Sequence, residues 1–153
     1  MRRIVALVVL VMLASCRTAP LGGPEPGARS SEAAVAQFLA AARAQDLQAM
    51  SAMWGNSESL VREREDRQEL ERRLIVMACH LKHDESRIGP SRRGEGGRIL
   101  HDVELSQGPK RATSTFTTVR NASADRWFVE NFEIESLKEL CAAAPSGFSG
   151  IGR

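Results

Sequence analysis

The spacing of apolar residues changes once along this chain, from a helical period to an alternating one. Between residues 31 and 81 the large apolar side chains recur three or four positions apart, as on one face of a helix. Between residues 98 and 134 they alternate with polar ones, as in a strand with one buried face. This order predicts an α+β domain, in which helices pack on one face of a curved antiparallel sheet.

Two helices are expected at the start of the domain. Ser30 or Ser31 can cap the first of them, because a serine hydroxyl accepts a hydrogen bond from a free N–H of the first turn. Its apolar stripe is Val35, Phe38, Leu39 and Ala42. Asp46 can cap a second, shorter helix, and Gly55-Asn56 would end it.

A third helix is expected over residues 59–80. Its apolar stripe consists of Leu70, Leu74, Met77, Ala78 and Leu81. Its first half carries charges of both signs at the i, i+4 spacing that stabilises helices, in the pairs Glu58–Arg62, Glu63–Arg67 and Glu69–Arg73. This charge run is typical of a solvated face, and an interaction surface is the alternative.

Strands are expected over residues 98–105, 110–120 and 126–134, which are rich in threonine, β-branched and aromatic residues. A weaker strand is expected over residues 81–88. The segment GPSRRGEGGR that follows it has the composition of a flexible loop.

The N-terminus has the form of an export signal. Arg2 and Arg3 precede an unbroken apolar run over residues 4–13, which is too short for a membrane span of roughly 20 residues. The sequence Leu-Ala-Ser-Cys that follows resembles the lipobox of bacterial lipoproteins. The resemblance implies cleavage after residue 15 and acylation of Cys16, which would anchor the protein to a membrane. An ordinary secretory signal that contains a cysteine is the alternative.

The lipoprotein interpretation divides the chain into four parts. Residues 1–15 would be the signal, residues 16–29 a flexible Pro/Gly-rich linker, residues 30–144 one domain, and residues 145–153 a disordered tail. Position 17 is Arg rather than the Asp of the inner-membrane retention signal, which favours the outer membrane in a Gram-negative host.

The charge of the mature chain argues against nucleic acid as a partner. Cleavage removes two of the 21 basic residues, leaving 19 against 19 acidic ones, so the mature chain has no net formal charge. A basic excess, on which nucleic-acid binding depends, is therefore missing.

Cys79 and Cys141 remain as a pair once Cys16 is assigned to the anchor. Outside the cytoplasm such a pair tends to be oxidised, so a disulfide between them is expected, with two buried thiols as the alternative. A redox role is not expected, because the sequence has no Cys-x-x-Cys motif.

The order of elements resembles the nuclear transport factor 2-like superfamily, in which a cone of sheet wraps around an N-terminal helix. The segments AAVAQFLAAARAQD, LQAMSAMWG and DRWFVENFEI carry this resemblance, which covers residues 31–141. One strand of that fold, between the second and third helices, has no counterpart in the sequence pattern. Cystatin-like and other helix-on-sheet folds remain open.

Few residues qualify as catalytic or metal-binding candidates. The resemblance implies an Asp or an Asp–His pair deep in the cone of an enzyme, and His101 is the one inward candidate, since Asp102 faces the other way. A hydrogen-bonded core histidine is the alternative. A second cluster holds Cys79, His80, His83 and Asp84, but its spacing does not define a closed zinc site, so no metal and no cofactor is expected.

Two functions follow from these observations. The first is a non-enzymatic envelope lipoprotein that binds a small apolar ligand or an envelope protein, in a pocket lined by Val103, Phe116 and Trp127 or Phe128. The second is a small isomerase or hydrolase that uses His101. The second predicts a buried acidic partner for that ring and a His101→Ala variant that loses activity but not stability.

Overall fold

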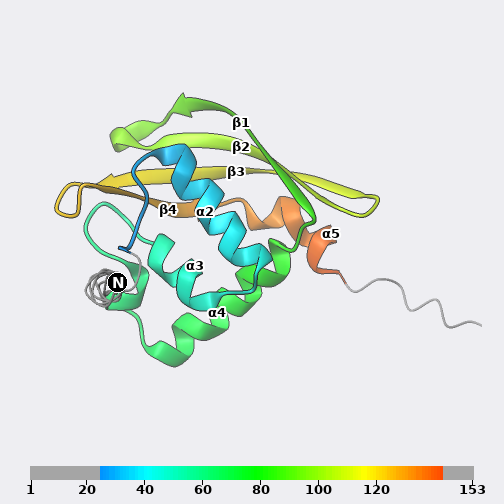
Figure 1. Cartoon of the computed structure of the whole chain (residues 1–153), viewed down its shortest axis with the longest axis horizontal. Helices are drawn as coiled ribbons and strands as arrows, with labels where there is room; N and C mark the ends of the chain where they lie inside the picture. Colours follow the sequence, from blue (N-terminus) through cyan, green and yellow to red (C-terminus); the bar gives the residue numbers. More distant parts are fainter. Residues whose placement is uncertain (1–24, 143–153) are drawn as a thin grey trace, which may run out of the picture.

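The computed structural model describes residues 25–142, which form helices followed by a four-stranded antiparallel sheet (Figure 1). The elements are α2 (Ser31–Arg43), α3 (Leu47–Met53), the 3-10 turn η1 (Val61–Glu63), α4 (Arg67–His80), β1 (Glu85–Arg93), η2 (Glu95–Gly97), β2 (Ile99–Gln107), β3 (Lys110–Asn121), β4 (Arg126–Phe132), η3 (Ile134–Leu137) and α5 (Lys138–Cys141). The α+β class predicted from the sequence is therefore confirmed. The signal peptide, the first part of the linker and the tail at 145–153 lie outside the described residues.

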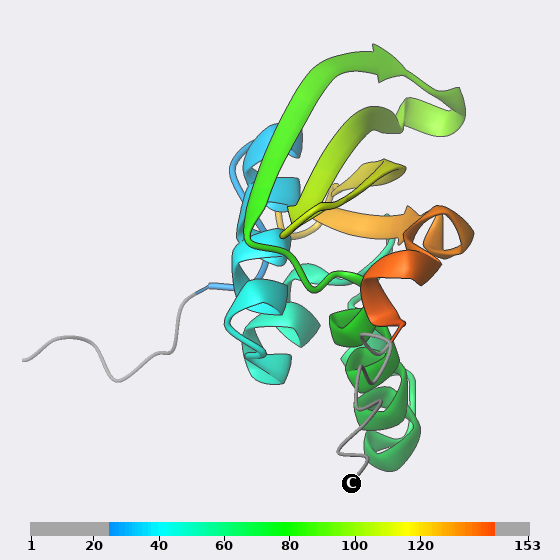
Figure 2. The same ribbon diagram turned by 90° about the vertical axis from the view of Figure 1, so that its right-hand side faces the viewer.

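Helix α2 crosses one face of the sheet, and the sheet curves around it (Figure 2). The Ser30 hydroxyl caps the helix by accepting from the N–H of Ala33 at 3.2 Å, as predicted. The predicted stripe of Val35, Phe38, Leu39 and Ala42 is fully buried. The core therefore lies between this helix and the concave face of the sheet.

The sheet has the order β1-β2-β3-β4, and each strand is antiparallel to the next. On β2, His101, Val103 and Leu105 are buried, whereas Asp102 and Glu104 are exposed. Facing residues pair across strands, including His101 with Phe116 and Val103 with Ser114. The predicted alternation in residues 98–105 and 110–120 is confirmed.

The prediction of a flexible loop over residues 89–98 is wrong. Strand β1 continues to Arg93, and the loop is reduced to the η2 turn. The composition was misleading because Gly89 and Pro90 lie where the β1–β2 register shifts, between Ile88 and Ser91. Proline is tolerated in an edge strand at such a bulge, and at Gly89 a Cβ atom would lie 2.9 Å from the carbonyl oxygen of Asp102.

The third helix is also shorter than predicted, because it begins at Arg67 and not near residue 59. Local hydrogen bonds hold the preceding segment out of the helix. The Asn56 carboxamide accepts from two backbone N–H groups, and the Glu63 carboxylate accepts from the N–H of Leu60. Asp66 then caps α4 by accepting from the N–H of Gln68 at 2.9 Å. Among the described residues, the segment between α3 and α4 forms the η1 turn and isolated β-bridges in place of a strand.

The N-terminal segment joins the fold before Ser30. Ala28 is buried and bridges Trp127 of β4, and the N–H of Gly27 donates to Ala52. Gly27 has φ +77°, and a Cβ atom there would lie 2.7 Å from the Phe128 ring. Two residues that the composition assigns to the linker therefore pack on the domain.

Cys79 and Cys141 form the predicted disulfide, with their Cα atoms 5.0 Å apart. The bond joins the last turn of α4 to α5 and closes a segment of 62 residues. Within residues 25–142, no helix combines the length and apolar character needed to cross a bilayer.

Candidate binding groove

The core occupies the place where the sequence suggested a pocket. Val103 and Phe116 are fully buried beneath α2, and Trp127 packs at the edge of the same core. Phe128 lies on the opposite face of the sheet, where it pairs with Val119. The cause is a bulge at Glu130, which shifts the register of β4 and reverses its alternation.

His101 is a buried core residue and is only 2% exposed. Burial lowers the pKa of its imidazole below the ordinary value of 6.5, and the carboxylate of Glu32 offsets this in part. The ring nitrogen Nε2 has no hydrogen-bond partner among the described residues. Asp102 points away, and its carboxylate accepts from Arg92 at 2.6 Å and from Thr115 at 2.8 Å.

A His101→Leu variant is expected to flatten the dependence of stability on pH. In the original protein the unfolded chain binds a proton near pH 6.5, whereas the folded chain resists it, because its pKa is lowered. Stability is then fully present above that pH and falls as the pH drops through the lowered pKa, by at most about 1.4 kcal/mol per pH unit. Urea unfolding at several pH values between about 7.5 and about 5.5 measures this slope.

A Val103→Ala variant is the control, because it removes buried methyl groups on the same strand face without removing a titrating group. It should lower the free energy of unfolding by the same amount at every pH. Equal pH slopes in the original protein and the His101→Leu variant would contradict the assignment.

Three of the four side chains of the suggested metal cluster have separate contacts, and Nδ1 of the fourth, His80, is buried without a hydrogen-bond partner among the described residues. Cys79 is in the disulfide, His83 Nδ1 lies 2.6 Å from the carbonyl oxygen of Leu81, and Asp84 accepts from the N–H of Gly108. Among the residues that the structure describes, no three His, Cys, Asp or Glu side chains are arranged to hold a metal ion.

A hollow with apolar side chains in its lining lies beside α4 instead, and we call it the α4 groove. It has a volume of about 420 Å³ and lies between α4 and the end of β4, with η3 and the end of α3 completing its walls. Its lining residues are Trp54, Glu69, Arg72, Arg73, Val76, Met77, Asn131, Phe132 and Ile134. This volume is within the range of small-molecule sites, which is about 300 to 1,000 Å³.

The floor of the groove is built from residues far apart in the sequence. Phe132 stacks on Phe116 in the core, with ring centroids 5.2 Å apart. The indole N–H of Trp54 donates to the Glu130 carbonyl at 3.4 Å, which fixes the ring against β4. Val76 forms part of the wall and is 52% exposed, beside Ile75 at 53%. These two are the large hydrophobic side chains that the described surface leaves exposed.

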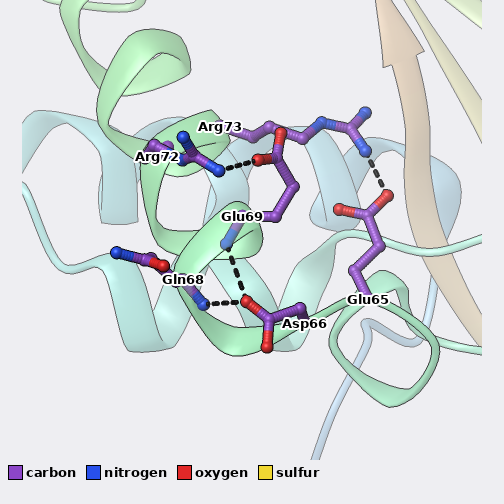
Figure 3. Close-up of polar contacts among 6 residues, drawn as sticks. All are labelled: Glu65, Asp66, Gln68, Glu69, Arg72 and Arg73. Carbon is purple, nitrogen blue, oxygen red and sulfur yellow. Dashed lines mark hydrogen bonds and ion pairs between the residues drawn. The ribbon is translucent and has the colours of Figure 1, made fainter.

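Arginines on α4 give the groove a charged rim (Figure 3). The guanidinium of Arg73 lies 4.5 Å from the centroid of the Trp54 ring and pairs with Glu65. Arg72 pairs with Glu69 one turn earlier. The predicted i, i+4 pair between Glu69 and Arg73 is replaced by these contacts, because the chain turns at Asp66 and brings Glu65 beside the helix.

A comparison of the chain with protein-family models and with curated proteins found no match. The groove must therefore be interpreted from its own chemistry: an apolar floor, an aromatic ring covered by a guanidinium, and a rim with charges of both signs.

A second hollow lies on the other flank of α4, against α3 and η1. Its volume is about 600 Å³, and charged residues dominate its lining, including Arg62, Glu63, Glu65, Arg67 and Glu71. Helix α4 is therefore a ridge between two hollows, and it extends away from the sheet (Figure 2). The apolar pattern of the sequence did not predict the α4 groove, although Ile75 and Val76 lie outside the apolar stripe of their helix and could have indicated it.

Proposed function

We propose that this chain is a lipid-anchored protein of the bacterial cell envelope, and that its domain binds a ligand or partner protein in the α4 groove without catalysing a reaction. The main support for a binding site is the exposure of Val76, a half-exposed apolar residue beside the apolar floor of the groove. Exposed apolar side chains next to a hollow mark ligand or protein contact sites, because covering them removes apolar area from water.

The ligand should be apolar with a polar end. The floor of Met77, Phe132 and Ile134 suits hydrocarbon or an aromatic ring. The rim offers guanidinium groups and one carboxylate, which favour a ligand with its own hydrogen-bonding group. An apolar side chain presented by another envelope protein has the same chemistry.

The resemblance to the nuclear transport factor 2-like superfamily belongs to the same proposal. The curvature of the sheet around α2 supports it. The segment between α3 and α4, which forms isolated bridges in place of a strand, counts against it. The enzyme hypothesis has less support, because His101 lies in the core and its Nε2 lacks the acidic partner that the hypothesis requires among the described residues.

A Val76→Asp variant is expected to weaken the binding of an amphiphilic fluorescent probe, anilinonaphthalene sulfonate, by about tenfold, because it puts a carboxylate in place of an aliphatic side chain that the bound probe would cover. The dissociation constant can be titrated on an unlipidated chain of residues 17–153, so that no acyl chain competes for the probe. This chain keeps every residue that the structure describes.

The matched control is Ile75→Asp. Ile75 neighbours Val76 and is equally exposed, but it does not line the groove. Its replacement should leave the dissociation constant unchanged. If both variants bind the probe as well as the original protein, the α4 groove is not the site.

A further inference from the structure

We propose that the α4 groove takes a small amphiphile with one anionic oxygen group, a carboxylate or a sulfonate, and that Arg73 binds this group while the apolar part lies against Val76 and Phe132. This inference rests on the proposed function, because it concerns the same groove. It adds the sign of the charge on the ligand, and it names the residue that recognises this charge.

The first argument is the balance of charge in the groove. Among the described residues, its lining holds the guanidinium groups of Arg72 and Arg73 and one carboxylate, that of Glu69. Glu65, which pairs with Arg73, lines the second hollow and not the α4 groove. The lining of the groove therefore has an excess of positive charge, which favours an anion over a cation.

The second argument is the position of Arg73. Its guanidinium lies 4.5 Å from the centroid of the Trp54 ring, which is itself buried and bonded to β4. Figure 3 shows the Arg73 side chain running from α4 toward Glu65, which holds its guanidinium from the segment before the helix. A guanidinium that is already held in place loses less conformational freedom when an anion binds than a free side chain does.

The third argument is the hydrogen-bonding capacity of the guanidinium. A guanidinium carries five N–H donors, and among residues 25–142 that of Arg73 donates to one group, the carboxylate of Glu65. The Arg73 side chain is 45% exposed, so a ligand can reach the other donors. Carboxylate and sulfonate oxygens accept such hydrogen bonds, whereas an ammonium group has no acceptor to offer.

A bilayer surface or a second protein fits the groove less well. Stable interfaces between proteins bury roughly 1,200 to 2,000 Å² in total. On the described surface, the exposed large hydrophobic side chains are Ile75 and Val76, and ion pairs of α4 lie near them. The groove wall from Glu69 to Met77 is about 12 Å long at 1.5 Å per residue. That length suits one aromatic group or one short acyl chain.

Two fluorescent probes that differ in charge test the proposal on the unlipidated chain of residues 17–153. Anilinonaphthalene sulfonate is an anion, and N-phenyl-1-naphthylamine has the same aromatic rings without the sulfonate. Arg73→Gln should weaken the binding of the anionic probe about tenfold more than that of the neutral probe, the order expected for one charge-assisted hydrogen bond at a partly exposed site. Arg73→Lys keeps the charge and should recover part of this loss.

Glu65→Gln gives an independent measurement in the opposite direction. It removes the carboxylate that competes with the ligand for Arg73, while its amide oxygen can still accept a hydrogen bond. The affinity for the anionic probe should rise severalfold relative to that for the neutral probe. A side chain with only a structural role would not produce such a gain.

The matched control is Arg67→Gln. Arg67 is an exposed arginine in the first turn of the same helix, and it lines the second hollow and not the α4 groove. Its replacement should leave the dissociation constants of both probes unchanged.

Two outcomes would overturn the proposal. In the first, Arg73→Gln changes the affinities for the two probes by the same factor. In the second, the probes are not distinguished, and the chain instead sediments with phosphatidylglycerol vesicles in a way that depends on Arg73, which would assign this residue to a membrane surface. Val76→Asp tests the groove itself, so a groove that binds both probes through Val76 without regard to charge refutes only the ligand class.

Discussion

A Cys16→Ser chain is expected to lack completely the acyl groups that the proposed lipobox implies for the original protein. The thioether needs the sulfur atom of Cys16, and a serine hydroxyl does not replace it. The protein purified from bacterial membranes should have the mass of residues 16–153 plus lipid, and this species should be missing from the variant. Two or more acyl chains anchor a protein stably, at about 0.8 kcal/mol per buried CH₂ group, so the change removes the whole anchor.

Arg17→Lys is the control, because it changes a neighbouring residue and keeps the small residues and the cysteine that precede it. Its mass should show the same lipid as the original protein. An original protein that has the uncleaved mass, or is cleaved without lipid, would remove the lipoprotein assignment.

Replacement of Cys79 and Cys141 together by serine is expected to lower the free energy of unfolding by about 4 kcal/mol. The bond spans 62 residues, and the chain-entropy model assigns this loss to the greater freedom of an unfolded chain without the cross-link. The folded state also loses the covalent link between α4 and α5. Denaturant unfolding of the unlipidated chain measures the difference.

Reduction of the original protein provides the control, because it opens the same bond without changing the sequence. The reduced protein and the double variant should unfold at similar denaturant concentrations. A loss below about 1 kcal/mol would place the bond among those that contribute little in the folded state.

Local features of the fold could be predicted because local physics decides them. Ser30 and Asp46 cap their helices as expected, since a side-chain oxygen can satisfy a free N–H wherever a helix starts. The faces of β2 and β3 followed from alternation alone, and His101 was correctly placed inward. The disulfide followed from counting cysteines after one had been assigned to the anchor.

The failures have two other causes, which are pairing with a neighbouring strand and local side-chain hydrogen bonds that compete with the helix. Residues 89–93 have a loop composition, yet they form a strand because β2 offers hydrogen bonds on both sides of the bulge. Helix α4 starts late because Asn56 and Glu63 hold the preceding backbone in turns. The spacing of apolar residues along the sequence does not indicate such strand pairing or such turns.

The α4 groove could not be predicted from the sequence either, because contacts between distant segments form it. Its floor and walls bring Trp54, Val76 and Phe132 together from three elements. The sequence predicted a pocket on the concave face, but α2 fills that face with buried side chains. A sequence pattern indicates which side of an element is apolar, and it does not indicate whether the neighbouring element leaves a space there.

Both edge strands of the sheet, β1 and β4, have features that hinder pairing with a further strand. At one border, β1 carries Pro90, which lacks an N–H donor, and exposed arginines at 87, 92 and 93. At the other, Ala28 and the segment at Trp54 and Gly55 take backbone positions along β4. Proteins tethered to a membrane meet their own copies at high lateral density, where unpaired strands would join into aggregates. Under the proposed lipid anchor, these two edges would hinder neighbouring copies from joining by strand addition.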